Sequence, residues 1–333
     1  MNKLTKLGVS ALCGSLAAVS AAQAGEISVS GGATATHVKK GYGETGNPIG
    51  MATSLTFKGS GELDNGNAVT LTIDHDDQNA FSAAQITYAT GLGVFSFDQG
   101  GGTGIDRYDD MMPTAWEETT GTGVDTGLRT VSGAGGGTDI ELAIDSSMLP
   151  DGMAAYIAYS PKADGGKAND KASTGATGDP VNGAGWDIAF DHTGLADGLK
   201  VFGGYSSIAQ GGQDRGSKVL GATYAVGSVT VGYQWSLDNV SNASTDAYEN
   251  QAFGVSFSVN DDLSMSYGYH ESEIKDEAGV DGGRTVEAHS FQVAYSMGGA
   301  TIKLAETSVD NALYNSTSAN DRDGTSIALS LAF

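Results

Sequence analysis

The chain has 333 residues, with 17 Lys and Arg against 40 Asp and Glu, so its formal net charge is −23. Such a chain lacks the clustered basic residues that neutralise phosphate, which argues against nucleic acid as a partner. After residue 24, no run of about 18 apolar residues predicts a membrane helix. A transmembrane β-barrel stays open, because its apolar face is hidden in the alternation of short strands.

The first 24 residues have the pattern of a secretory signal peptide. Lys3 and Lys6 precede an uncharged stretch, and Ala22-Gln23-Ala24 forms a small-x-small cleavage site. We expect cleavage after Ala24 and export through the periplasm. A lipoprotein modified at Cys13, the chain's single cysteine, is disfavoured because the preceding Leu12 is not small. Cleavage removes two lysines and no acid, so the mature net charge would be −25.

Sixteen later segments alternate apolar and polar residues, as strands between two environments do. Between Val229 and Leu237 the odd positions are apolar and the even positions are polar or small. Leu263, Met265 and Tyr267 repeat this pattern. The predicted strands begin near residues 26, 51, 67, 83, 93, 137, 153, 184, 199, 216, 228, 248, 263, 285, 299 and 324.

The connections between these segments alternate in length. Seven are short, and two of them, Asp64-Asn65-Gly66 and Asn260-Asp261-Asp262, have the residues of tight hairpin turns. Eight are long, and the third long one, residues 100–136, is the longest. Short turns on one side, long loops on the other and aromatic residues near strand ends are typical of a transmembrane barrel. We therefore predict an all-β, antiparallel up-and-down barrel of about 16 strands over residues 25–333; a soluble β-sandwich or solenoid is the alternative.

The signal peptide, the sixteen segments, the terminal Phe333 and the third loop with "DRYDDMMPTAWEE" resemble the general diffusion porins of Gram-negative bacteria, especially the alphaproteobacterial type. The resemblance covers residues 25–333. It implies a homotrimer in the outer membrane, in contact with lipid and lipopolysaccharide. It also implies that the barrel assembly machinery recognises a last strand ending in Phe333. Finally, it implies that the third loop folds inward and narrows the pore, with its carboxylates facing basic residues on the opposite wall.

The third loop, defined as residues 100–136, carries the candidate constriction. Pro113 and Trp116 could pack on a barrel wall and leave the charged side chains in water. Thr114-Ala115-Trp116-Glu117 has the form of a capping box and predicts a short helix. The charged candidates are Asp106, Arg107, Asp109, Asp110, Glu117, Glu118 and Arg129.

The basic partners of these acids are harder to place from the sequence. If Leu55 and Phe57 face lipid, Lys58 faces the lumen and is the candidate on the opposite wall. We expect Arg107 and Arg129 to pair with acids of their own loop. Small residues on the lumen side favour open water there: Gly232, Gly254, Ser256, Ser266 and Gly268.

Three further motifs occur in the sequence. Residues 101–109 match one copy of a calcium-binding nonapeptide; a calcium roll needs stacked copies, but a single Ca²⁺ on Asp106, Asp109 and Asp110 stays open. No other cofactor is expected. The G-x-G-x-x-G at residues 41–46 is not followed by a helix pattern. His270 and Ser272 suggest a hydrolase, but no G-x-S-x-G occurs, and we predict no enzyme.

The sequence therefore predicts an outer-membrane pore for passive diffusion of ions and small hydrophilic solutes. Barrels of about eight strands are filled by side chains, whereas sixteen strands leave an aqueous lumen. The acidic charge predicts weak cation selectivity. The alternatives are a substrate-selective channel and a structural or adhesive barrel that acts through its external loops.

Overall fold

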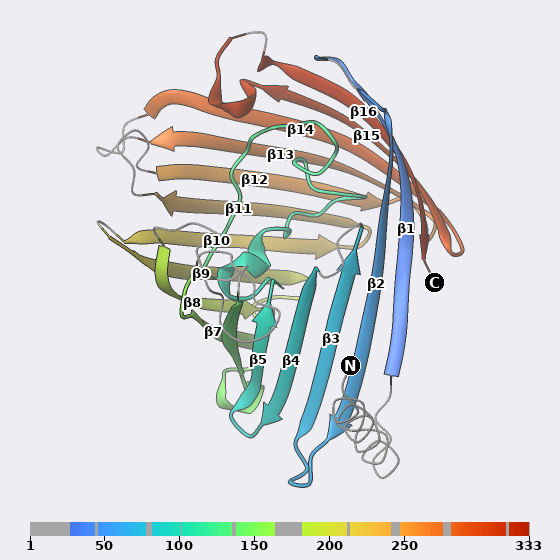
Figure 1. Cartoon of the computed structure of the whole chain (residues 1–333). Helices are drawn as coiled ribbons and strands as arrows, with labels where there is room; N and C mark the ends of the chain where they lie inside the picture. Colours follow the sequence, from blue (N-terminus) through green and yellow to red (C-terminus); the bar gives the residue numbers. More distant parts are fainter. Residues whose placement is uncertain are drawn as a thin grey trace, which may run out of the picture.

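The structure is a computed structural model that describes residues 27–43, 46–77, 82–100, 102–134, 138–163, 182–211, 214–240, 247–275, 281–317 and 320–332. The predicted signal peptide and Phe333 lie outside the described residues. Within them, sixteen strands form a closed antiparallel barrel in which each strand pairs with its sequence neighbours and β1 pairs with β16 (Figure 1). The predicted all-β barrel is confirmed.

The observed strands begin within four residues of the predicted positions. The strands are β1 (Ile27–Lys40), β2 (Ile49–Glu62), β3 (Ala68–Asp76), β4 (Ala83–Thr90), β5 (Gly93–Gln99), β6 (Thr138–Ile144), β7 (Met153–Ser160), β8 (Asn182–His192), β9 (Leu199–Gln210), β10 (Arg215–Val226), β11 (Val229–Asn239), β12 (Ala247–Ser258), β13 (Leu263–Lys275), β14 (Asp281–Met297), β15 (Ala300–Asp310) and β16 (Arg322–Ala332).

The outer face of the barrel is exposed and apolar. It is apolar because the register places apolar residues of adjacent strands on the same side of the sheet. Val231 pairs with Val255, and Val255 pairs with Tyr267. Exposed aromatic residues lie near both ends of the strands. Tyr159 and Trp186 are nearer the long loops, and Tyr224, Phe257 and Tyr295 are nearer the short turns. Such a surface is what a lipid environment requires of a barrel.

The described residues include three short 3-10 turns, η1 (Gly104–Tyr108), η2 (Ser146–Met148) and η3 (Ala312–Tyr314). None of the described helical segments is long or apolar enough to span a membrane. The capping-box prediction at residues 114–117 is wrong, since this segment is not helical.

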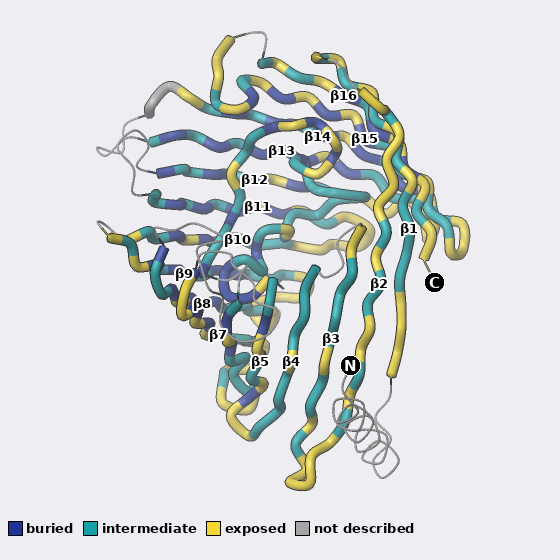
Figure 2. Tube along the Cα trace, viewed as in Figure 1, coloured by how far each residue is buried: buried dark blue, intermediate teal, exposed yellow. Residues whose placement is uncertain are grey.

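Burial on the inner face differs between the two sides of the barrel (Figure 2). Strands β1 to β4 have no fully buried residue among those described. In β11 and β13, by contrast, buried residues recur at every second position, as in Gly268, His270, Ser272 and Ile274. The difference arises because the third loop, which joins β5 to β6, lies inside the barrel against β8 to β16 (Figure 1).

Candidate functional site

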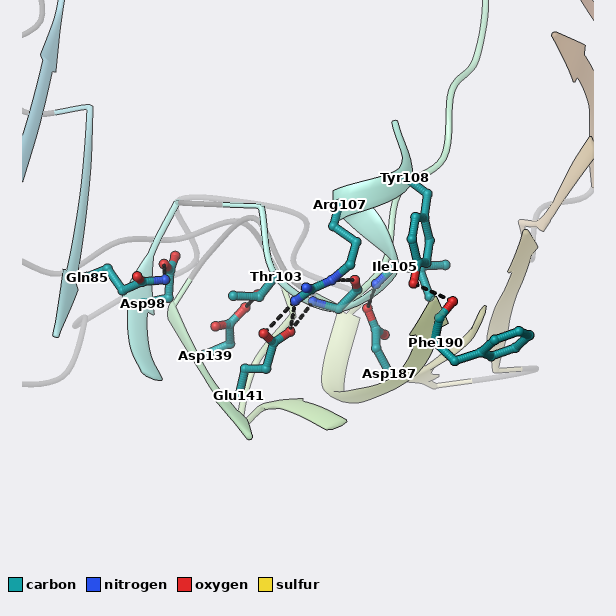
Figure 3. Close-up of polar contacts among 11 residues, drawn as sticks. Gln85, Asp98, Thr103, Ile105, Arg107, Tyr108, Asp139, Glu141, Asp187 and Phe190 are labelled. Atoms are coloured by element: carbon teal, nitrogen blue, oxygen red, sulfur yellow. Dashed lines mark hydrogen bonds and ion pairs between the residues drawn. The ribbon is translucent and has the colours of Figure 1, made fainter. Parts of the chain in front are cut away.

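Where the third loop enters the barrel, carboxylates of the inner wall accept hydrogen bonds from it (Figure 3). The hydroxyl of Thr103 donates to Asp139 on β6. The backbone N–H of Gly104 donates to Glu141 Oε2 at 2.8 Å, and that of Ile105 donates to Asp187 Oδ2 on β8 at 3.0 Å. The N–H groups at the start of a helical turn have no partner within the turn, so the wall carboxylates satisfy them. This arrangement fixes η1 against β6 and β8.

Arg107 also points at the wall and not at the acids of its own loop. Its guanidinium contacts Glu141 Oε1 at 2.5 Å and lies over the Tyr156 ring, 3.5 Å from the ring centroid. The predicted pairing of Arg107 with loop acids is therefore not observed. The reason is that Glu141 faces inward on β6 where the loop enters, and both of its carboxylate oxygens accept hydrogen bonds from Nη2 of Arg107.

An apolar core inside the barrel holds the same part of the loop. Tyr108 stacks on Phe202 of β9 with ring centroids 5.0 Å apart, and its hydroxyl donates to the carbonyl of Phe190 at 2.8 Å. Ile105 is fully buried and contacts this cluster, which also contains Val219 of β10. Burial of two large side chains stabilises the inward position by several kcal/mol, at about 1.5–3 kcal/mol for each buried side chain.

Three glycines of the wall make room for the middle of the loop. A Cβ on Gly232 would lie 2.5 Å from Pro113 Cδ, and one on Gly254 would lie 2.9 Å from the same atom. A Cβ on Gly268 would lie 2.5 Å from Thr119 Oγ1. The interpretation of these glycines as lining open water is therefore wrong, because the third loop covers them.

Side chains of the wall take the backbone hydrogen bonds of the segment for which a helix was predicted. The N–H of Ala115 donates to Ser266 Oγ at 2.8 Å. The N–H groups of Trp116 and Glu117 donate to Gln292 Oε1 at 3.1 and 3.0 Å, and Gln292 Nε2 donates back to the carbonyl of Glu117 at 2.6 Å. Because side chains of β13 and β14 accept hydrogen bonds from these N–H groups, the capping-box residues lie along the wall and do not form a helical turn.

The end of the loop is attached to β14, β15 and β16. Thr307 Oγ1 donates to Thr122 Oγ1 at 2.7 Å, and Ser326 donates to the carbonyl of Thr122. Val124 is buried in a cluster with Val286 and Val309. The loop thus contacts the wall along most of its described length.

The side of the loop that faces away from the wall lines a cavity of about 400 Å³. Of the predicted constriction residues, Asp110, Glu117 and Glu118 line it together with Trp116. Asp106 and Arg107 do not line it. The structure therefore divides the predicted acidic cluster between the lumen and the wall.

Burial and like-charge crowding raise the pKa values of these acids. Burial, with Asp110 and Asp109 nearby, raises the pKa of Glu118 to about 9. Burial, with Asp109 and Asp187 nearby, raises the pKa of Asp106 to about 6. Burial also raises the pKa of Asp109, and that of Glu117 despite the opposing effect of Lys303. The cluster consequently carries less negative charge at neutral pH than its composition indicates.

The basic residues near the lumen are few in the described part of the chain. Lys58 is exposed and shares the inner face of β2 with Thr56, which donates to Asp74 at 2.6 Å. Arg129 lies over the Tyr248 ring at 4.8 Å from its centroid, and it forms none of the described ion pairs. The sequence prediction missed Lys303, whose amino group lies over the Trp116 ring, 5.9 Å from the centroid. The alternation Ile302-Lys303-Leu304 was the signal that places it on the inner face.

The comparisons with known proteins agree with this architecture. No protein-family model matches the chain, and no curated protein matches it. Among solved structures, OmpF of Salmonella typhi matches with a TM-score of 0.66 and 18% identity, over 93% of this chain and 98% of that one. The anion-selective porin of Comamonas acidovorans matches with a TM-score of 0.62 and 14% identity, over 93% and 100%. A variant of the Rh. blastica porin matches with a TM-score of 0.57 and 16% identity, over 92% and 100%.

These likenesses establish the fold class. The chain is a closed sixteen-stranded antiparallel barrel of the kind found in general porins. The alphaproteobacterial type stays a prediction, because the matched porins differ little in their identity to this chain.

Proposed function

We propose that this protein is an outer-membrane porin, a water-filled channel for passive diffusion of ions and small hydrophilic solutes. The observation that carries the proposal is the third loop, which is held on one side of the inner wall and presents an acidic surface to the remaining lumen. A sixteen-stranded barrel is wide enough to leave such a lumen. The apolar outer face supports a location in the membrane.

The proposed selectivity is weakly cationic. Three acids, Asp110, Glu117 and Glu118, line the lumen side of the loop. The positive charge of Lys303 lies near Glu117 and offsets part of their negative charge. Carboxylates in a narrow passage concentrate cations through their field. The raised pKa of Glu118 reduces that field near neutral pH, so we expect a modest preference.

We further propose that the barrel works as a homotrimer in contact with outer-membrane lipid and lipopolysaccharide. OmpT of Vibrio cholerae, one of the similar structures, was determined in a trimer form. Insertion by the barrel assembly machinery, with Phe333 as its signal, rests on the resemblance to porins alone.

An enzymatic role is not favoured by the residues that suggested it. His270 is buried beneath the third loop, and Ser272 Oγ lies 2.6 Å from the hydroxyl of Tyr314. Neither side chain is open to a substrate in this arrangement. We therefore propose a channel without catalytic activity.

The test is planar-bilayer conductance of the refolded mature protein, with the reversal potential measured in a salt gradient. We expect ohmic pores that prefer cations, and Asp110→Asn with Glu117→Gln should move the reversal potential toward anions. That shift should shrink at about 1 M salt, where screening acts over roughly 3 Å. The control is Asp261→Asn in an exposed short turn, which should leave the reversal potential unchanged.

The absence of any conductance from a correctly folded barrel would contradict the channel and favour the structural or adhesive role. Strong preference for one sugar over others of equal size would favour a substrate-selective channel.

A further inference from the structure

A polar cavity lies between the third loop and the inner face of β11, β12 and β13. Asp109 and Glu118 line it from the loop, and Gln234, Asn250 and His270 line it from the wall. The cavity has about 20 Å³ of free room. One water needs about 10–15 Å³ by the same measure, so the cavity fits one water or one ion.

Buried acceptor atoms without partners surround this cavity. Among the residues that the structure describes, Gln234 Oε1, Asn250 Oδ1, His270 Nε2 and Asp109 Oδ1 have no hydrogen-bond partner. The three wall residues are only 6%, 4% and 8% exposed, respectively. Asn250 Nδ2 donates to Ser236 Oγ at 3.1 Å, which leaves its carbonyl oxygen directed elsewhere. Buried polar atoms are nearly always satisfied, so a cluster of unsatisfied atoms around one cavity needs an occupant.

The charge around the cavity identifies the kind of occupant. Oxygen atoms of Asp109, Asp110 and Glu118 all lie within 4.8 Å of one another. None of the ion pairs in the described part of the chain involves these three residues. A single water donates only two hydrogens, which is too few for the acceptors present. A cation, in contrast, interacts with all of them at once and offsets the repulsion between the carboxylates.

We propose that this cavity binds one Ca²⁺, with Asp109, Glu118, Gln234 and Asn250 as its protein ligands. Ca²⁺ accepts several oxygen ligands from carboxylates and amide carbonyls in flexible geometry, whereas Mg²⁺ demands a regular octahedron and Zn²⁺ prefers nitrogen and sulfur. Asp110 adds negative charge from the lumen side. The site differs from the set expected from the sequence, because the metal-competent group includes Glu118 and does not include Asp106.

The ligands come from both the loop and the wall, so the ion fastens the middle of the third loop to β11 and β12. This inference concerns metal binding and stands whether or not the barrel conducts.

The test is calorimetric titration of the chelator-treated, refolded mature barrel with CaCl₂ at about 0.15 M KCl, where the Debye length is about 8 Å and diffuse attraction is screened. We expect one saturable site per chain. Tb³⁺ should occupy the same site and show luminescence sensitised by Trp116. Added Ca²⁺ should displace the Tb³⁺ and abolish this luminescence.

Two variants separate ligands from general charge. Asp109→Asn with Glu118→Gln should weaken Ca²⁺ binding by about tenfold or more, and Asn250→Leu, which leaves every carboxylate in place, should also weaken it. The control, Asp261→Asn with Asp262→Asn, replaces the same number of carboxyl groups in an exposed turn and should bind as the wild type does. Circular dichroism and the heat-dependent gel mobility report whether each variant is folded. A wild-type protein without a saturable site, or a folded ligand variant that binds like the control, would overturn the proposal.

Discussion

The two halves of the inner wall share one sequence pattern and face different surroundings. On β1 to β4 the inward residues are mostly small or polar, and no described residue is fully buried. On β11 to β13 the inward residues are also small or polar, yet they are buried under the third loop. The comparison teaches that the alternating pattern distinguishes residues facing lipid from residues facing the interior. It does not distinguish inner-wall residues that face the open lumen from those that a loop covers.

The largest effect is expected from removing the obstruction. Deleting residues 106–118 removes Tyr108, Pro113 and Trp116, through which the loop meets the covered half of the wall. We expect conductance to rise severalfold and larger sugars to pass in liposome-swelling assays, because the covered half would become lumen. A folded deletion variant with wild-type conductance and an unchanged sugar cutoff would show that the loop lies outside the pathway.

The next largest effect tests the lipid-facing outer surface, which both halves of the wall have. Val231 lies on the exposed outer face, and Thr230 lies on the inner face of the same strand. Val231→Arg should lower the free energy of folding in bilayers by about 2–4 kcal/mol, because it places a charge among lipid chains. Thr230→Arg is the matched control and should cost clearly less in the same urea titration. Equal costs at the two positions would contradict a lipid-facing outer surface.

A smaller effect should distinguish a covered glycine from an uncovered one. Gly254 on the inner face has three atoms of Pro113 within 3.0 Å of an added Cβ, whereas Gly59, on the outward side of β2, has no described atom within 4 Å. Gly254→Val should therefore destabilise the barrel by about 1–3 kcal/mol through overpacking or displace the loop. Urea unfolding and single-channel conductance report these two outcomes. Gly59→Val is the control, and indistinguishable behaviour of the two variants would mean that Pro113 is not seated at Gly254.

The strand positions were predictable because a period of two residues is enforced along every strand by two contrasting environments. The inward course of the third loop was also expected, although only from the resemblance to porins. Individual contacts were not predictable. Arg107 binds Glu141 and not a neighbouring acid, because residues 34 positions apart meet only where the loop folds back on β6. The cavity between the loop and Gln234, Asn250 and His270 likewise depends on where the loop lies over three strands.

The most direct test of the inward loop is a cross-link between Thr119→Cys and Gly268→Cys. A Cβ on Gly268 would lie 3.9 Å from Thr119 Cβ, and disulfides join Cβ atoms about 3.5–4.5 Å apart. The mature chain is expected to have no cysteine of its own, because Cys13 lies in the predicted signal peptide. We predict near-complete disulfide formation in the folded barrel, with conductance unchanged by oxidation. The control, Thr119→Cys with Thr56→Cys on the uncovered half, should stay reduced. Failure of the Thr119–Gly268 pair to cross-link, or a disulfide that forms equally well with Thr56→Cys, would contradict the placement of the third loop against β13.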